Sequence, residues 1–322
     1  MKQYQEILQK VLKHGVERTN RTNQKDIFIP SATMEVDLRD GFPALTTKQL
    51  FYKQSIGEII GFIRGYDNAA DFRALGCNIW NSDANENATW LKSPYRKGED
   101  DLGKIYGSTW RKRTVHRDTN DGNTVDYSIA DGYTLLAKYH NLNILSKDVD
   151  QLRDVVDAII HNPNNRRIIL HAWFPELFDE MALPPCHVMY RFIPDEKNKV
   201  LHMSMFQRSC DLFLGVPFNL FGSSLLLRLV AEACGYTAGV FTHNMADVHI
   251  YENAIDAVNE QLGHPELPSP ELRIHTNPPS DNSTDEAIKW LENIEPQHIA
   301  LSGYNFNRLR TGRVQMAQET NA

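Results

Sequence analysis

The segment at residues 217–234 constrains the fold of this chain more than any other part of its sequence. It is a long, mostly apolar run that begins with Pro217 and is followed by Gly235. Proline is favoured in the first turn of a helix and glycine just past the last turn, so the run predicts one long helix. Segments rich in β-branched and aromatic residues lie on both sides of it, at 167–173, 187–193, 200–206 and 241–251. Such segments are typical of strands, and we expect an α/β fold in which the first three pair in one sheet.

Further helices are predicted where apolar residues recur at helical spacing. These cover residues 4–12, 51–63 and 149–160, and another helix is expected after the last strand, up to about Leu262. Two polar stretches, at 82–102 and 113–133, interrupt the pattern and indicate irregular surface insertions. We therefore expect a single domain over residues 1–322 that carries these two insertions.

Composition limits the classes of protein to which the chain can belong. Its 322 residues are 41% hydrophobic and 23% charged, as in an ordinary globular protein. A net charge of -7 offers no broad basic surface for nucleic acid, so an anionic substrate must be held by local arginines. The sequence opens without a signal-peptide run, and no segment has the roughly twenty apolar residues of a membrane span, which predicts a cytoplasmic protein. The four cysteines lack metal or disulfide spacing, so we expect neither a metal site nor a disulfide framework.

Two short segments contain the residue types of a nucleophilic site. Cys186 stands in the sequence Pro-Pro-Cys-His, and the run at 207–219 carries an arginine, a carboxylate and a carboxamide. A thiol attacks as the thiolate, which nearby positive charge favours, so Arg208 is the candidate partner of a nucleophilic Cys186. Taken alone, a cysteine such as Cys186 is more often a small core residue than a nucleophile. Glu58, also taken alone, could be an ordinary position on a helix with no role in the site.

Eight strings of this sequence occur in an order that is very improbable by chance. They are DGFPALTTK at 40–48, IGEIIGFIRG at 56–65, NIW at 78–80, YGSTWR at 106–111, NPNNRRIILHAW at 162–173, PPCH at 184–187, QRSCDLFLGVPFN at 207–219 and ADVHIY at 246–251. In these strings the chain resembles the thymidylate synthase family, folate-dependent enzymes that alkylate C5 of a pyrimidine nucleotide. The resemblance implies an α+β fold with a mixed sheet flanked by helices, and a homodimer whose interface is one face of that sheet.

The chemistry of the uracil ring assigns the central role to Cys186. Addition of its thiolate at C6 of dUMP turns C5 into an enolate carbon that attacks a one-carbon unit. The resemblance implies that this unit is 5,10-methylenetetrahydrofolate and that the thiolate leaves again by β-elimination. Glu58, on an otherwise apolar helical face, could have a raised pKa and relay protons at C5 and O4 through water. The resemblance also places Arg208, Asn219, Tyr106 and His187 in the catalytic set.

The resemblance implies a nucleotide site that two subunits share. Arg21, Arg208 and Ser209 would bind the phosphate from the subunit that owns Cys186, and Arg166 and Arg167 would reach in from its twin. His249 and Tyr251 alternate on a strand and share one face, where they would meet the sugar 3′-hydroxyl. Without the resemblance, adjacent arginines would be a solvated charge run and this aromatic pair part of the core. The full nucleotide-binding set is Arg21, Arg166, Arg167, Gln207, Arg208, Ser209, Asp211, Asn219, His249 and Tyr251.

The implied folate site combines apolar side chains for the pterin with one carboxylate for its N–H edge. Its residues are Ile79, Trp80, Leu183, Asp211, Leu214, Gly215 and Phe218. Base identity depends on Asn219, because a carboxamide donates to O4 and accepts from N3–H of uracil. Cytosine presents the reverse pattern, which related cytidylate enzymes meet with an aspartate. Asn219 therefore favours dUMP.

Departures from the family bear on the last chemical step. Asp83 stands where a second tryptophan is usual in the family. Gln49 and the run Arg21-Thr-Asn-Gln replace residues that the family usually has. The C-terminal segment at 311–316 is altered, and residues 317–322 follow it. Hydride transfer to the one-carbon unit on the base gives dTMP, and addition of water gives 5-hydroxymethyl-dUMP. Exclusion of water from the site decides between these two products. These changes should admit water, so we expect a deoxyuridylate hydroxymethyltransferase of the kind that some bacteriophages encode. A thymidylate synthase is the alternative, and a catalytically silent nucleotide-binding protein is a third.

Overall fold

One large mixed sheet organises the computed structural model, which describes residues 1–20 and 23–311. The strand order is β1-β2-β10-β8-β7-β6, and β9 also pairs with β10. Only β8 and β9 run parallel to β10, and the other neighbours are antiparallel. The strands are β1 (Val16–Thr19), β2 (Lys25–Asp37), β6 (Ile169–His171), β7 (His187–Asp195), β8 (Val200–Gln207), β9 (Cys210–Asp211) and β10 (Thr237–Tyr251). The predicted α+β class and the pairing of β6, β7 and β8 are confirmed.

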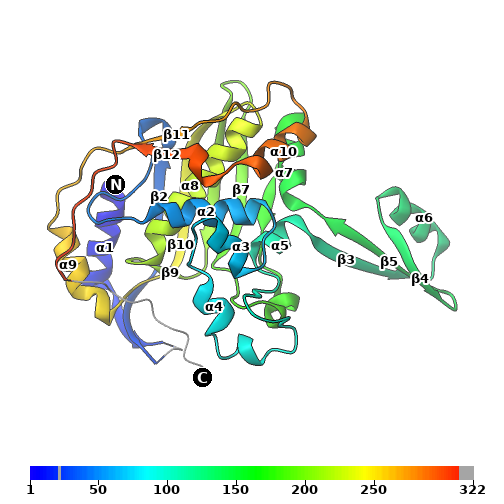
Figure 1. Cartoon of the computed structure of the whole chain (residues 1–322), viewed down its shortest axis with the longest axis horizontal. Helices are drawn as coiled ribbons and strands as arrows, with labels where there is room; N and C mark the ends of the chain where they lie inside the picture. The colour runs from blue at the N-terminus through cyan, green and yellow to red at the C-terminus, as the bar shows by residue number, and fades with distance from the viewer. Residues whose placement is uncertain (21–22, 312–322) are drawn as a thin grey trace.

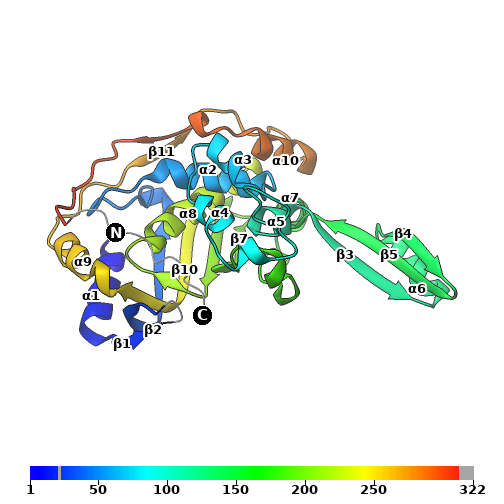
Figure 2. The same ribbon diagram turned by 60° about the horizontal axis from the view of Figure 1, so that its bottom comes forward.

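Helices cover one face of this sheet in two layers (Figures 1 and 2). Helix α8 (Gly215–Ala233) lies directly on β8, β9 and β10, and α2 (Tyr52–Ile63) packs on α8. Helix α10 (Thr284–Asn293) packs against α2, α8 and α7 (Gln151–His161). At the other end of the sheet, α1 (Lys2–His14) packs on β2 and β10, and α9 (Ile255–Leu262) on α1. The helices predicted at 4–12, 51–63, 149–160 and 217–234 are therefore confirmed.

Helix α8 is enclosed because it is apolar on almost every side. Leu220, Phe221 and Leu225 have no exposed surface, and Arg228 pairs with Glu232 along the one polar edge. Burial of each such apolar side chain contributes about 2 kcal/mol. Within residues 1–20 and 23–311, no helix combines the length and apolarity needed to cross a membrane.

An aromatic cluster beneath α2 supports the region that contains Cys186. Gly61 allows it to form, since a Cβ atom there would lie 2.3 Å from a ring carbon of Phe72 on α3 (Ala69–Ala74). The ring centroid of Phe62 lies 5.7 Å from that of Phe72 and 4.8 Å from that of Tyr106. Tyr106 belongs to α5 (Tyr106–Arg111). Close packing of this kind holds side chains in single rotamers.

Residues 113–149 form an arm that projects from the body (Figures 1 and 2). It contains β3 (Arg113–Thr119), α6 (Gly122–Ala130), β4 (Thr134–Tyr139) and β5 (Leu142–Val149), and its sheet order is β3-β5-β4. The expectation of irregular chain at 113–133 was wrong, because β3 pairs with β5 over its whole length and the Asp121 carboxylate caps α6. Polar side chains mark this segment as exposed, and exposure does not prevent regular hydrogen bonding.

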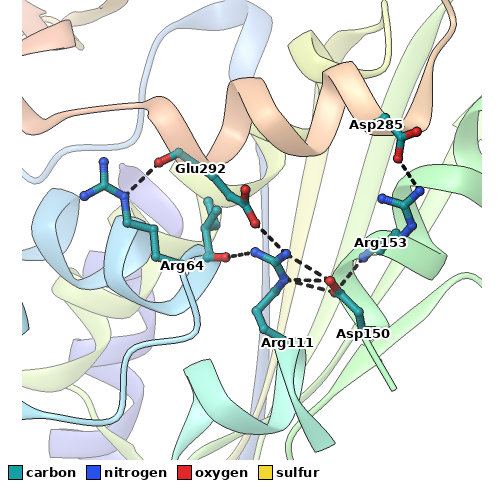
Figure 3. A network of polar contacts seen from close by, with 7 residues as sticks. Arg64, Arg111, Asp150, Arg153, Asp285 and Glu292 are labelled. Carbon is teal, nitrogen blue, oxygen red and sulfur yellow. Dashed lines mark hydrogen bonds and ion pairs between the residues drawn. The ribbon is translucent and has the colours of Figure 1, made fainter. Parts of the chain in front are cut away.

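A buried arginine fixes the root of the arm (Figure 3). The Arg111 guanidinium donates to both carboxylate oxygens of Asp150 at 2.9 Å and to Glu292 of α10 at 2.7 Å. It also donates to the carbonyl of Ile63 at the end of α2. Arg111 and Asp150 lie just outside the first and last strands of the arm. Both ends of the arm are thus tied to the helical layer.

The stretch at 82–102 contains only short elements and turns. An ion pair between Arg73 and Asp100, at 2.6 Å, closes it against α3. The remaining elements of the fold are η1 (Leu38–Asp40), α4 (Asn81–Asn85), η2 (Trp90–Lys92), η3 (Pro175–Glu180), η4 (Glu252–Ala254), β11 (Glu271–Ile274), η5 (Pro296–His298) and β12 (Ile299–Ser302).

Candidate active site

Cys186 is held by the hydroxyl of Tyr106. The backbone N–H groups of Cys186 and His187 donate to this hydroxyl oxygen at 2.7 and 3.1 Å. Burial, together with the charge of nearby Cys186, raises the pKa of Tyr106 well above its usual value, so the phenol stays neutral. Its own hydrogen remains available for donation. Cys186 is partly exposed and forms no disulfide, as a nucleophile requires.

Arg208 brings a fixed positive charge to the segment that carries Cys186. Its guanidinium donates to the carbonyls of Pro185 and Pro184, both at 2.9 Å, and its backbone N–H donates to the carbonyl of Cys186 at 3.0 Å. The guanidinium also stacks 5.5 Å from the ring centre of Trp173. A cationic group held in this way favours the thiolate form of a neighbouring cysteine. Arg208 thus contacts the backbone of residues 184–186, and its action on the Cys186 thiol stays a prediction.

A cavity of about 600 Å³ opens beside Arg208. One wall comes from the stretch at 82–102, which contributes Trp90 and Lys92, and the other contains Trp173 and Phe178. That stretch therefore reaches the neighbourhood of the site. Sequence reasoning did not identify Trp173 as a site residue, although it lies in a string on which the resemblance rests.

Glu58 is a buried carboxylate on α2 with a strongly perturbed pKa. Burial raises its pKa to about 7, and the charge of Asp83 adds to the rise. The indole N–H of Trp80 opposes it by donating to the carboxylate at 3.1 Å. A group that titrates near neutral pH can both accept and release a proton. The ring of Trp80 lies 6.2 Å from that of Tyr106, so this carboxylate adjoins the Cys186 region.

A chain of hydrogen bonds orients Asn219. The Gln207 side-chain amide donates to the Asn219 oxygen at 2.9 Å and to the carbonyl of Ser209 at 3.0 Å. The Gln207 oxygen must then accept from Nε2 of His243, 2.8 Å away. Burial lowers the pKa of His243 to about 3, so this ring is neutral. With its oxygen satisfied by Gln207, the Asn219 carboxamide presents its N–H₂ group in a defined direction.

His187 adds a second neutral imidazole. Burial lowers its pKa to about 4, and its Nδ1 lies 2.9 Å from the hydroxyl of Tyr190. Within the described part of the chain, Nε2 of His187 is buried without a hydrogen bond of normal geometry, and the nearby Asn219 side chain partly opposes the fall in its pKa. A buried polar atom without a partner costs about 1–3 kcal/mol and indicates a ligand or ordered water. His243 and Tyr190 were not predicted, because each looks like an ordinary strand residue.

The predicted sugar and phosphate residues are only partly brought together. His249 and Tyr251 share one face of β10 as expected, with ring centres 5.1 Å apart. Arg166 and Arg167 lie exposed in the turn between α7 and β6, at the surface of this subunit. Arg21 lies outside the described residues.

The predicted folate residues differ in exposure, because Trp80 is buried in the core and several of the others are only partly buried. Ile79, Leu183, Leu214 and Phe218 pack on the core but keep exposed area. Asp211 accepts from the backbone N–H groups of Phe213 and Leu214 through one carboxylate oxygen, both at 3.0 Å. A Cβ atom on Gly215 would lie 3.5 Å from the side-chain oxygen of Asn219 and 3.6 Å from Cβ of Asp211, so Gly215 adjoins both of these residues. These residues fit a flat apolar ring with a polar edge.

Lys48 is buried next to these residues. Its ammonium group donates to the carbonyl of Phe213 and lies 3.8 Å from the centre of the Phe213 ring. Burial lowers the pKa of Lys48 to about 8, an effect that the charge of Asp211 opposes. The lysine therefore supports the segment that presents the Asp211 carboxylate.

Comparison with known proteins gives a consistent family assignment. The sequence model of the family described as thymidylate synthase matches residues 2–316. A protein of Pseudomonas syringae pv. tomato named thymidylate synthase is 42% identical over 318 residues, which cover 97% of this chain and 98% of that protein. Proteins of the same name from Pseudomonas putida and Bordetella parapertussis are 42% and 40% identical and cover 94% of this chain and 96% of their own length. The chain therefore belongs to the thymidylate synthase family.

Proposed function

We propose that the protein converts dUMP to dTMP with 5,10-methylenetetrahydrofolate, as a thymidylate synthase. Members of this family are one-carbon transferases that use this folate as co-substrate. The observation that carries the proposal is the position of Tyr106 between the backbone of Cys186 and the Glu58–Trp80 pair. A nucleophile and a group that titrates near neutral pH thereby meet in one site.

The expected preference for a hydroxymethyl product is not supported. The relatives named above are bacterial thymidylate synthases that match this chain over nearly its whole length. The preference rested on Asp83 and on the C-terminal segment, and residues 312–322 lie outside the described part of the chain. Methylation is therefore the better-supported reading.

The side chains suit the following sequence of steps. The Cys186 thiolate bonds to C6 of dUMP, and the electron pair of the C5–C6 double bond moves into the enolate of C5 and O4. C5 of this enolate then attacks the one-carbon unit as one of the two bonds between that unit and the folate nitrogens breaks.

Glu58 accepts the C5 proton through water, and the remaining bond between the one-carbon unit and the folate breaks as the exocyclic methylene forms, which releases tetrahydrofolate. The thiolate leaves C6 when hydride adds to this methylene, and the C5–C6 double bond is restored. Hydride from tetrahydrofolate completes the methyl group and yields dihydrofolate. We propose that Asn219, with His187, recognises the O4 edge of the base.

We further propose that the active unit is a homodimer formed through the uncovered sheet face. Helices cover only one face, and on the other Phe206 and Ile193 are 41% and 44% exposed. Exposed large apolar side chains on a sheet face are typical of an interface. Arg166 and Arg167 would then bind the phosphate held by the partner subunit, with Arg208 and Ser209 of that subunit.

One contiguous buried core from Tyr4 to Ile299 also supports our proposal of a single domain.

The product distinguishes the two folate reactions. With dUMP and methylenetetrahydrofolate, we expect equal amounts of dTMP and dihydrofolate. Dihydrofolate is followed by its near-ultraviolet absorbance, and mass spectrometry separates the methyl from the hydroxymethyl nucleotide. Tetrahydrofolate with 5-hydroxymethyl-dUMP would contradict the proposal and restore the hydroxymethyltransferase. Absence of any product, with nucleotide binding intact, would indicate the silent binding protein.

Asn219→Asp is expected to shift the preference from dUMP towards dCMP. The new carboxylate still accepts from Gln207, so the local structure is kept, but the donor to O4 of uracil is lost. The mismatch with uracil should cost about 1–3 kcal/mol, or roughly ten- to a hundredfold in kcat/KM. Competition between the two nucleotides measures the ratio, and Gln207→Glu serves as a comparison because it disturbs the orientation of Asn219 and leaves the carboxamide itself in place. An unchanged ratio in Asn219→Asp would show that the base is recognised elsewhere.

A further inference from the structure

We propose that Arg18 and Asp247 are positioning residues for the sugar of the nucleotide. Their ion pair holds the backbone carbonyl of Asp247, and this carbonyl sets the tautomer of His249. In that tautomer, His249 accepts a hydrogen bond from a sugar hydroxyl. The inference rests on the proposed nucleotide function and on His249 facing the sugar. Neither Arg18 nor Asp247 is itself a residue that touches the substrate.

Several contacts fix the Arg18 guanidinium. Its Nη2 donates to the Asp247 carboxylate at 2.5 Å, and its Nε donates to Asp26 at 2.8 Å. The guanidinium also lies 4.0 Å from the ring centre of Phe28. The Asp26 side chain is only 1% exposed, whereas the Arg18 and Asp247 side chains are 32% and 37% exposed, so solvent screens the pair with Asp247 more than the pair with Asp26. Arg18 thereby connects β1 and β2 to β10.

Asp247 has a backbone conformation that needs such support. Its φ of +47° lies in the left-handed region, although it stands within β10 between residues that both pair with β2. This conformation costs an ordinary residue roughly 1–2 kcal/mol. The carboxylate bound to Arg18 offsets that cost. The unusual turn of the backbone directs the Asp247 carbonyl towards His249.

The hydrogen bond between this carbonyl and His249 sets the imidazole tautomer. Nδ1 of His249 lies 2.8 Å from the Asp247 carbonyl oxygen, which can only accept. Nδ1 must therefore carry the hydrogen, and in the neutral ring Nε2 presents a lone pair. A ligand group that meets Nε2 of the neutral ring must be a donor. A sugar hydroxyl satisfies this requirement, and an ether or a hydrogen atom does not.

Tyr251 completes the recognition of a hydroxyl. Burial raises its pKa to about 12, so it stays protonated, and its ring stands edge-on to that of His249. One side chain accepts and the next can donate, which matches the two hydrogen-bonding modes of an alcohol. Through His249, Arg18 and Asp247 therefore help the protein to distinguish a nucleotide that has a 3′-hydroxyl from one that lacks it.

The test compares binding of dUMP with binding of 2′,3′-dideoxy-UMP by titration calorimetry. Asp247→Asn removes the charge while asparagine still tolerates the left-handed backbone, and Arg18→Gln removes the other partner. Each variant is expected to weaken dUMP binding about tenfold and to change dideoxy-UMP binding less than about twofold, because the lost contact exists only with the hydroxyl. Arg153→Gln, which breaks the remote pair with Asp285 (Figure 3), is the matched control and should leave the ratio of the two affinities unchanged.

The possible outcomes separate this inference from the proposed function. An equal loss of affinity for both nucleotides in Asp247→Asn would show a merely structural role and overturn the inference. If His249→Ala abolishes the discrimination and Asp247→Asn keeps it, the sugar contact stands and the inference fails. If the unmodified protein binds both nucleotides equally, the sugar contact itself is refuted and the inference falls with it. Since binding is measured without turnover, failure to make dTMP affects only the proposed reaction.

Discussion

Cys186→Ser should lower kcat by about a thousandfold or more and leave the affinity for dUMP nearly unchanged. A serine hydroxyl is not ionised at neutral pH, so Arg208 has no anion to stabilise and the addition at C6 is lost. The backbone hydrogen bonds to Tyr106 do not involve the sulfur atom, and the replacement is nearly isosteric. The geometry around the site should therefore persist.

Turnover and nucleotide binding are measured separately for this variant. Cys234→Ser is the matched control, because Cys234 lies at the C-terminal end of α8, outside the candidate site. With 5-fluoro-dUMP and methylenetetrahydrofolate, intact-protein mass spectrometry should show an adduct in the unmodified protein and none in Cys186→Ser. Turnover above a few per cent of the unmodified rate would exclude Cys186 as the nucleophile.

Glu58→Gln should nearly abolish turnover and make the protein more stable above pH 7. Burial raises the pKa of Glu58 to about 7, from about 4.5 in the unfolded chain, so ionisation is disfavoured in the native state. The stabilising contribution of a raised carboxyl pKa is complete below the unfolded value and is lost as pH rises through the folded value. Glutamine does not ionise, so the variant keeps the stability that the unmodified protein loses as Glu58 ionises. This loss amounts to at most about 3 kcal/mol.

Urea unfolding at pH 5 and pH 8, at fixed protein concentration, measures this effect. Glutamine keeps an oxygen that accepts from the Trp80 indole, so the comparison isolates the charge. We expect the two proteins to differ little at pH 5 and the variant to be more stable at pH 8. Equal stability at both pH values would show that Glu58 is ionised at little cost, and would refute its assignment as the group that titrates near pH 7.

Sequence patterns predicted the elements whose side chains face only one environment. Helix α8 is mostly apolar, and β7 and β8 are rich in apolar and aromatic residues, so their types were evident. Strand β2 was not predicted, because Pro30 and Ser31 interrupt it and many of its side chains are exposed. Its long pairing with β10 stabilises it, and no local pattern encodes that pairing.

The site was predictable where a residue contributes its own chemistry. Cys186, Arg208 and Asn219 stood out because of their functional groups. His243 and Arg18 act through other residues, and their effect depends on the register between strands that are distant in sequence. His243 lies opposite Met205 and Met34 in the sheet, and its bond to Gln207 arises only after β8 and β10 have paired. Such relations follow from tertiary structure and leave no signature at a single position.

Because the arm is anchored to the body at its root, the arm and the body can open by local unfolding independently of each other. Arg113 and Val149 face each other across one strand pair, and the Arg111–Asp150 contacts bind that pair to the helical layer. Beyond this point β4 is exposed along its entire length, so little apolar contact resists its opening. We therefore expect amide hydrogens of β4 to exchange with solvent through local opening, and those of α8 to exchange only when the whole body unfolds. Because the chain leaves and re-enters the body at adjacent positions, evolution could lengthen or shorten this hairpin without displacing any group that surrounds the bound nucleotide.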